Sequence, residues 1–344
     1  MTKIIEKLIS FIAVAIILAG VPLLVLSQQR PPATHAPPDV LIGVPKKGLY
    51  ERPYVGERDT SEKSIKADSQ IIVELCVNQG KVKVNGWNRA EARVYVSDGN
   101  KFVFNVREKS AKTGDPNWVK VIGSDTSKGM YPKGECISAN EIDIDVPINA
   151  TINLRGHEIT TDIDSVRKVE IKIAGGQISL RNIANGITAY AGQGGITVEA
   201  STGPMLLDST NGNIVIFEAR PAELGDIFRA KTTGGTISLQ GLEHRQVEAS
   251  SISGSVVYGG QIRNGGSYSL TTNKGSIRMS LAINASFQMQ ATYRAGNFNS
   301  ELPIKLQTEN IQEGPIKTIV GKLGTGDASI KLTTNNGSIS IRKL

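Results

Sequence analysis

The feature that most constrains the fold of this 344-residue chain is a short repeat in its second half. Each copy starts with a glycine, continues with a small polar residue and then alternates apolar and polar residues. The copies recur about every 20 residues, if the last interval counts as two steps with one degenerate copy. A fixed period of this length is typical of solenoids, in which each repeat packs only against its neighbours. The repeat glycines are Gly176, Gly195, Gly212, Gly235, Gly254, Gly275, Gly296 and Gly337.

The length of the repeat indicates the kind of solenoid. At roughly 3.3 Å per residue, a 20-residue repeat forms one coil of two or three short strands with turns. Aromatic residues make up only 5% of the chain, and the apolar residues are mostly Ile, Val and Leu, which stacked strands favour. An open antiparallel meander would instead show a turn about every 8 to 12 residues. The sequence therefore predicts an all-β fold, a parallel β-solenoid (β-helix) over residues 67–344, with the glycines at turns of positive φ.

An apolar segment stands at the N-terminus. Lys3 and Lys7 precede an apolar run from Leu8 to Leu26, for which we expect a hydrophobic helix. The run fits either a cleaved signal peptide that ends at Ser27 or a retained anchor that holds the protein at the membrane. Both interpretations of residues 1–27 predict an exported protein, in the periplasm, at the cell surface or membrane-anchored and facing outside the cytoplasm.

Residues 28–66 differ in composition from the solenoid repeats. Six of the 14 prolines lie between Pro31 and Pro53, and charges of both signs follow without an apolar period. Such a segment is semi-extended and has too few apolar residues to form a core. The sequence predicts a Pro-rich flexible tether here.

The charge distribution argues against a nucleic-acid partner. The formal net charge is +7, but the Lys and Arg residues are spread along the chain. Phosphate backbones are bound by Lys and Arg clustered on one face. No Gly-Lys-Ser or Gly-Lys-Thr phosphate loop is present either, so we expect no nucleotide cofactor.

The chain contains two cysteines, Cys76 and Cys136. In an oxidising compartment such a pair is a disulfide candidate. The alternative is two buried thiols that pack as small apolar residues. Sequence separation does not decide between them.

The histidines do not form a pattern that binds metal or catalyses a reaction. His157 is followed by Glu, as in a zinc-protease helix, but Thr161 stands where the second His would be. His35 lies in the Pro-rich segment, and His244 lies between two charged residues, which predicts a surface turn. We expect no catalytic residue, no metal site and no cofactor.

Paired carboxylates are the strongest candidates for chemistry. Asp143 and Asp145 share one face of a predicted strand, and Asp162 and Asp164 share one face of another. Such pairs bind Ca²⁺ or act in glycoside hydrolysis. The simpler interpretation is a solvated strand face whose carboxylates pair with Arg167-Lys168.

Aromatic residues offer stacking surfaces for sugars or partner proteins. For Trp87, which ends a predicted strand, the preferred interpretation is that it caps an open edge of the solenoid. The candidates are Trp87, Trp118, Tyr258, Tyr268 and Tyr293.

Three segments resemble a family of bacterial β-strand-repeat proteins labelled "putative adhesins". They are residues 80–94, which read GKVKVNGWNRAEARV, the Val146-Pro147 exit from a strand, and the closing segment 324–341 with its Gly-Ser-Ile repeat. The resemblance covers residues 70–344. It implies a β-solenoid in the cell envelope with no established biochemical activity, and it assigns no functional residue.

These observations predict an exported, non-enzymatic cell-envelope protein with an adhesin-like or structural surface. The expected partners are cell-surface glycans or envelope proteins. One alternative is a polysaccharide lyase or hydrolase on a β-helix scaffold. Another is a membrane-tethered scaffold or sensor.

Overall fold

The computed structural model describes residues 61–98, 102–108, 115–123, 136–310 and 315–344. These residues form 25 strands joined in one continuous sheet, without a helix among them. The expected N-terminal helix and signal or anchor of residues 1–27, and residues 28–60 of the tether, fall outside the described residues. Within the described ranges, no helix with the length and apolar character of a membrane span is found.

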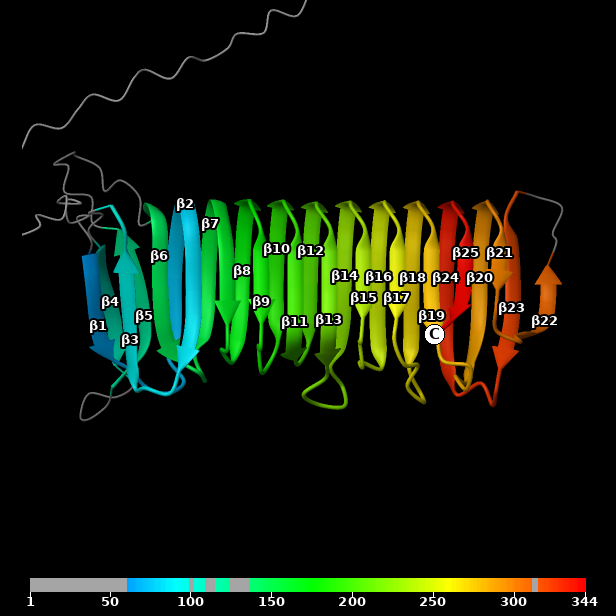
Figure 1. The fold of residues 1–344 in the computed structure, drawn as a ribbon, viewed down its shortest axis with the longest axis horizontal. Coiled ribbons are helices and arrows are strands. Elements are labelled where there is room, and N and C mark those ends of the chain that lie inside the picture. Colours follow the sequence, from blue (N-terminus) through cyan, green and yellow to red (C-terminus); the bar gives the residue numbers. More distant parts are fainter. Residues whose placement is uncertain (1–60, 99–101, 109–114, 124–135, 311–314) are drawn as a thin grey trace, which may run out of the picture. The chain divides into compact units, whose positions relative to one another are not determined.

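The central part of the molecule is a stack of coils with two strands each (Figure 1). We call the stack of first strands layer 1 and the stack of second strands layer 2. Each strand pairs in parallel with its equivalents in the neighbouring coils. In layer 1 the strands are β8 (Lys168–Gly175), β10 (Ile187–Gln193), β12 (Met205–Asn211), β14 (Ile227–Gly234), β16 (Gln246–Ser253) and β18 (Ser267–Lys274). In layer 2 they are β9 (Ile178–Arg181), β11 (Ile196–Thr202), β13 (Ile214–Arg220), β15 (Ile237–Gln240), β17 (Val256–Gly259) and β19 (Ile277–Leu281).

Buried aliphatic side chains form ladders between the layers. Because successive side chains of a strand point to opposite faces, every second residue of each coil faces inward. The register pairs each inward residue with one of the same kind in the next coil. Full burial of such a side chain stabilises the fold by about 1.5–3 kcal/mol. One ladder in layer 2 consists of Ile178, Ile196, Ile214, Ile237, Val256 and Ile277, all fully buried.

The repeat glycine lies at the corner between the two layers, where the coils approach closely. A Cβ atom on Gly194 would lie 1.6 Å from the carbonyl oxygen of Gly176, and one on Gly212 would lie 2.0 Å from that of Gly194. A positive φ does not explain why every repeat has a glycine at this corner, because Gly176 and Gly194 have a positive φ whereas Gly212 and Gly235 do not. The prediction that φ explains the glycines is therefore only partly right. The register also makes Gly194, rather than Gly195, the equivalent of Gly176.

A ladder of buried hydroxyl groups accompanies the glycines. Each hydroxyl lies three residues before the glycine of its own coil and donates a hydrogen bond to the glycine carbonyl of the adjacent coil. These bonds satisfy polar groups inside the stack, which would be costly to leave unpaired. The donors are Ser209, Thr232, Ser251, Thr272 and Thr334, at 2.7–2.9 Å from their acceptors.

The C-terminal coil is inserted out of chain order. Strand β24 (Ala328–Asn336) pairs in parallel with β18 on one side and with β20 (Phe287–Ala295) on the other. In the same way β25 (Ile339–Lys343) lies between β19 and β21 (Phe298–Ser300). Figure 1 shows the red β24 between β18 and β20. The coils therefore do not stack in chain order at this end of the molecule.

The long interval between the last two repeat glycines holds a hairpin rather than a degenerate coil. Its strands are β22 (Lys305–Asn310) and β23 (Lys317–Leu323), which pair antiparallel. Strand β23 also pairs antiparallel with β20, so the hairpin covers this end of the parallel stack.

The N-terminal end also departs from chain order. Strand β2 (Ile72–Trp87) and strand β7 (Thr151–Asp164) each run through both layers. Strand β2 lies between β7 on one side and β5 (Pro116–Gly123) and β6 (Ile137–Pro147) on the other. The result is that β6 and β7, consecutive in the chain, are separated by an earlier strand.

Antiparallel strands complete this end. Strand β3 (Glu91–Val96) pairs with β6, β1 (Ser61–Lys66) pairs with β3, and β4 (Phe102–Glu108) pairs with β5. Residues 61–66, which the sequence analysis placed in the tether, therefore belong to the sheet. The fold is an all-β solenoid with mostly parallel strands and antiparallel strands at both ends.

Candidate functional site

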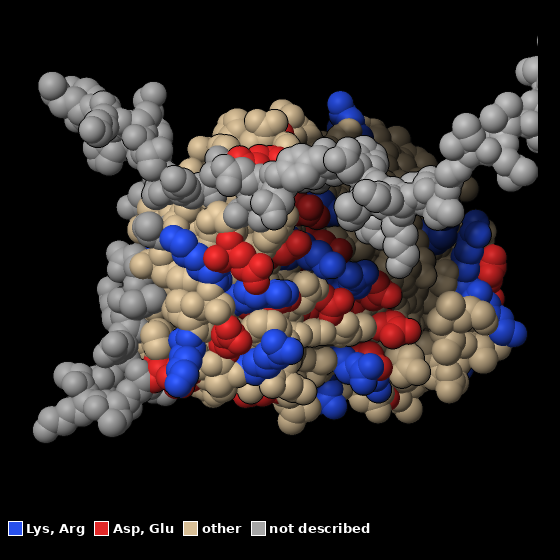
Figure 2. Space-filling model, turned by 60° about the vertical axis from the view of Figure 1, so that its left-hand side comes forward, with Lys and Arg blue, Asp and Glu red and all other residues tan. Residues whose placement is uncertain are grey.

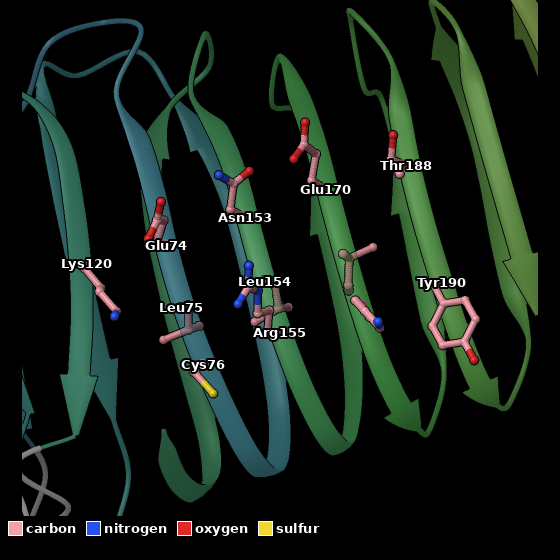
Figure 3. Close-up of a pocket in the computed structure, with 12 residues that line it drawn as sticks. Glu74, Leu75, Cys76, Lys120, Asn153, Leu154, Arg155, Glu170, Thr188 and Tyr190 are labelled. Atoms are coloured by element: carbon pink, nitrogen blue, oxygen red, sulfur yellow. The ribbon is translucent and has the colours of Figure 1, made fainter. Parts of the chain in front are cut away.

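A groove runs across the outward face of layer 1, from β2 over β7, β8 and β10 to β12. Figure 3 shows the side chains that line it between β2 and β10. The groove consists of two adjoining hollows of about 450 and 820 Å³. Arg155, Lys172 and Tyr190 line both hollows and so form the middle of the groove. The groove crosses successive coils, so its axis is perpendicular to the strands.

The β-sheet register positions these three side chains. Arg155 on β7 is paired with Lys172 on β8, which is paired with Tyr190 on β10. The neighbouring Leu154 and Ile171 face inward and are buried, so alternation directs Arg155 and Lys172 outward. Adjacent strands are about 4.8 Å apart. The sheet thus presents two cations and an aromatic ring in a row, at the spacing of the coils.

Two contacts hold the Tyr190 ring. The Nζ atom of Lys172 lies 5.4 Å from the ring centroid, within the range of a cation–π contact. The hydroxyl of Tyr190 is 3.3 Å from the Oγ1 atom of Thr210 on β12. The ring therefore has a defined orientation at the floor of the groove.

The cations of the groove differ from others on the same layer. Figure 2 shows Lys and Arg side chains next to Asp and Glu side chains over the N-terminal coils. Farther along layer 1, Arg229 and Lys231 lie 2.7 and 3.6 Å from carboxylate oxygens of Glu248. By contrast, no carboxylate of the described residues lies within 4.0 Å of Arg155 or Lys172. Neither cation therefore forms an ion pair with a carboxylate in the described part of the chain.

Acidic residues also line the groove, one row away. Glu74 and Glu170 lie two positions earlier on their strands, at the level of Asn153. Glu170 is paired with Lys168, whose Nζ atom is 2.9 Å from its Oε1 atom. The negative charge of Glu170 is thus largely neutralised by a residue of its own strand.

The candidate aspartates come together on the outward face of layer 2. Asp143 and Asp145 on β6 and Asp162 and Asp164 on β7 flank the same two positions of β2. Sequence reasoning found both pairs, but it could not show that an earlier strand brings them to either side of β2.

Arginines from other strands bind three of these aspartates, Asp145, Asp162 and Asp164. The Nε atom of Arg93 on β3 donates a hydrogen bond to Asp145 over 2.9 Å. Arg181 on β9 lies 3.2 Å from Asp162 and 3.3 Å from Asp164. The expected partners make other contacts. Lys168 pairs with Glu170, and Arg167 donates to the backbone oxygen of Asn149 and to the hydroxyl of Thr151.

The environment shifts two of the aspartates in opposite directions. Burial, and then the charge of Glu141, raise the pKa of Asp143. Burial also acts to raise the pKa of Asp164, but hydrogen bonds from Asn182 and Ser165 and the charge of Arg181 outweigh it and lower that pKa. Across the described residues, no group of three or more His, Cys, Asp or Glu side chains is arranged to hold a metal ion. The cluster is an ion-pair network on the sheet surface.

The two described histidines differ in burial. His157 is an exposed residue of β7, so the helix that a zinc-protease motif needs is missing. His244 is fully buried, which contradicts the expected surface turn. Its Nε2 atom donates a hydrogen bond to the carbonyl oxygen of Gly203 over 2.9 Å, and its ring packs 5.8 Å from that of Phe228.

The aromatic candidates are mostly not on the surface. Tyr258, Tyr268 and Tyr293 are buried between the layers, so they are unable to stack on a ligand. Trp87 donates from Nε1 to the backbone oxygen of Glu91, and its strand is flanked on both sides, so it does not cap an open edge. Sequence reasoning missed Tyr190. Its outward position could have been found by aligning it with Lys172 one repeat earlier.

The two cysteines meet next to the groove. The sulfur atoms of Cys76 on β2 and of Cys136, which precedes β6, are bonded in the structure, with Cα atoms 4.4 Å apart. Cys76 lies at the same level of the sheet as Arg155. The bond therefore fastens the strand that borders the groove.

Comparisons with known proteins bear on the fold. A family model described as Toastrack DUF4097 matches residues 119–342. A solved structure from Clostridium sporogenes, described as "a putative cell adhesion protein", is 10% identical over 83% of this chain and 100% of its own, with a TM-score of 0.23. One from Bacteroides fragilis, described as "a putative adhesin", is 11% identical over 83% and 97%, with a TM-score of 0.33. One from Parabacteroides distasonis, described as "Putative lipid binding protein", is 11% identical over 84% and 98%, with a TM-score of 0.31. The comparison with curated proteins found no match.

Proposed function

This chain belongs to the Toastrack DUF4097 family, and from that premise we propose that it is an exported, non-enzymatic binding protein of the cell envelope. Its ligand is an extended polymer, a glycan or a protein segment, held in the groove of layer 1. The observation that carries this proposal is that Arg155, Lys172 and Tyr190 occupy the same position in three neighbouring strands and line one continuous groove. A ligand that lies across the strands meets a new contact in each coil.

Binding is favoured over catalysis by the state of the carboxylates. A glycosidase needs one carboxylic acid and one carboxylate that face a common substrate. In layer 2, Asp145, Asp162 and Asp164 are instead bound by Arg93 or Arg181.

Export is supported by the N-terminal apolar run and by the bonded cysteines. Disulfides persist in oxidising compartments and are rare in the cytosol. The same proposal places residues 28–60 between the N-terminal segment and the solenoid as a tether.

Blocking the groove tests the proposal. Purified full-length protein is applied to an array of purified linear polysaccharides, neutral and charged, and of extended peptides. We expect at least one polymer to be retained, and Thr188→Trp to weaken its binding at least tenfold, because this exposed position lines the groove. Ser269→Trp is the matched control, because Ser269 lies in the same row of layer 1, farther along the stack. Retention of no polymer, or equal binding by the Thr188→Trp protein, contradicts the proposal.

A further inference from the structure

We propose that the ligand of the groove is an anionic glycan, a sugar chain that carries a carboxylate, sulfate or phosphate group in each repeating unit. This inference rests on the proposed binding function and adds the chemical class of the ligand. Arg155 and Lys172 bind successive anionic groups, and Tyr190 stacks against a sugar ring.

The first argument is the state of the two cations. Both belong to one row of the sheet, and both lack a carboxylate partner among the described residues. Glu170, which lies two positions before Lys172 on β8, forms an ion pair with Lys168. Guanidinium and ammonium groups without a carboxylate partner attract anions, and Arg binds carboxylate, sulfate or phosphate in a bidentate manner.

The second argument is the aromatic ring next to the cations. The apolar faces of sugar rings pack against aromatic side chains, as other apolar groups do. Tyr190 lines both hollows, and contacts with Lys172 and Thr210 hold its ring. A cation beside a fixed aromatic ring matches a sugar that has an apolar face and a charged substituent.

The third argument is the direction and the spacing. The strands are about 4.8 Å apart, roughly the length of one sugar unit in an extended chain, so one unit spans one coil. At the level of Tyr190 the next coil presents Asp208, which would repel an anion. The charged part of the ligand therefore extends from Tyr190 over Lys172 and Arg155 toward β2.

The test compares polymers that differ in charge. Binding of the full-length protein is measured with polygalacturonate, dextran sulfate, a polyol phosphate polymer and neutral dextran. We expect at least one anionic polymer to bind and neutral dextran to bind at least tenfold more weakly, with an affinity that falls as salt screens the charges. The three anionic polymers distinguish carboxylate from sulfate and phosphate as the preferred group.

Matched variants separate this site from general electrostatic attraction. The variant Arg155→Gln/Lys172→Gln should lose at least tenfold in affinity for the anionic polymer. The variant Arg229→Gln/Lys231→Gln removes the same charge from the same layer outside the groove, and it should change affinity by less than twofold. Tyr190→Phe should retain binding, whereas Tyr190→Ala should weaken it at least tenfold.

The outcomes distinguish the two proposals. If dextran or a peptide binds in the groove as tightly as the anionic polymers, the inference fails and the binding function stands. If both charge variants weaken binding equally, attraction is non-specific and the inference also fails. If no polymer of any kind binds, the proposed function itself fails. Thermal unfolding of each variant shows whether the sheet is intact.

Discussion

Cys76 and Cys136 are 60 residues apart in the chain, yet their disulfide joins two neighbouring strands, β2 and the start of β6. Strand β2 occupies a place between β6 and β7 that chain order alone would not give it. The disulfide therefore fixes a non-sequential neighbour at the border of the groove.

Removal of this disulfide should destabilise the protein. In the chain-entropy model, a crosslink that closes a loop of this size stabilises by about 4 kcal/mol. We expect the variant Cys76→Ala/Cys136→Ala to lose about 2–5 kcal/mol in free energy of unfolding, measured by urea denaturation. Reducing agent should have a similar effect on the native protein and none on the variant. Alkylation of both thiols in the unreduced native protein, detected by mass spectrometry, would rule out the bond.

A repeat glycine should not tolerate even one methyl group. Gly212→Ala places a Cβ atom 2.0 Å from the carbonyl oxygen of Gly194, so the two coils must separate. We expect a loss of more than about 2 kcal/mol in stability, comparable to severe overpacking. Gly225→Ala is the control, because an added Cβ there meets nothing within 4 Å. Similar melting temperatures for the two variants would contradict the close-approach explanation.

The buried hydroxyl ladder should contribute through hydrogen bonds rather than through shape. Thr272 donates from Oγ1 to the carbonyl oxygen of Gly254 over 2.7 Å. Thr272→Val keeps the volume but leaves that carbonyl without this donor, which costs about 1–3 kcal/mol. Thr271→Val changes the adjacent residue, which faces outward, and should alter the unfolding free energy by less than about 0.5 kcal/mol. Equal effects of the two changes would show that the ladder does not stabilise the stack.

His244 should make stability depend on pH in a mildly acidic range. Burial lowers the pKa of His244 below its ordinary value of 6.5, against the opposing effects of the bond to Gly203 and the charges of Asp226 and Glu243. The unfolded chain therefore binds a proton before the folded protein does. The free energy of unfolding should be highest above about pH 6.5 and should fall as the pH falls through the lowered pKa.

Urea denaturation between pH 7.5 and 5 checks this dependence. His244→Gln removes the titrating group and should flatten the curve. The lowered pKa of Asp164 acts only at more acidic pH, where that carboxylate is protonated. A slope that persists in the His244→Gln protein would assign it to another group.

The repeat predicts the parallel coils and the inward alternation because both depend on local spacing. Consistent use of that alternation would have placed Tyr258 inward, since Val256 two residues earlier is inward. The order in which the coils stack cannot be predicted from local spacing. The Gly-Ser-Ile of the final repeat at Gly337 is identical to that at Gly275, so local sequence does not tell which coils are neighbours. His244 was misplaced because its charged neighbours indicated a solvated turn, whereas the turn directs the imidazole into the core.

The site was harder to predict than the fold. The aspartates were visible as alternating pairs, but their partners Arg93 and Arg181 come from strands that chain distance does not suggest. Arg155, Lys172 and Tyr190 form a group only once three coils are aligned. Each of these residues stands alone in its own repeat, so the sequence does not mark them as one site until the register of the strands is known.

The position of β24 and β25 has a consequence for biosynthesis. Synthesis on the ribosome delivers β20 and β21 before the strands that will separate them from β18 and β19. The stack is thus unable to grow to completion coil by coil behind the emerging chain. Strands β24 and β25 leave the exit tunnel after the strands on both sides of them, and a product terminated before them would leave β18 and β19 without their parallel partners.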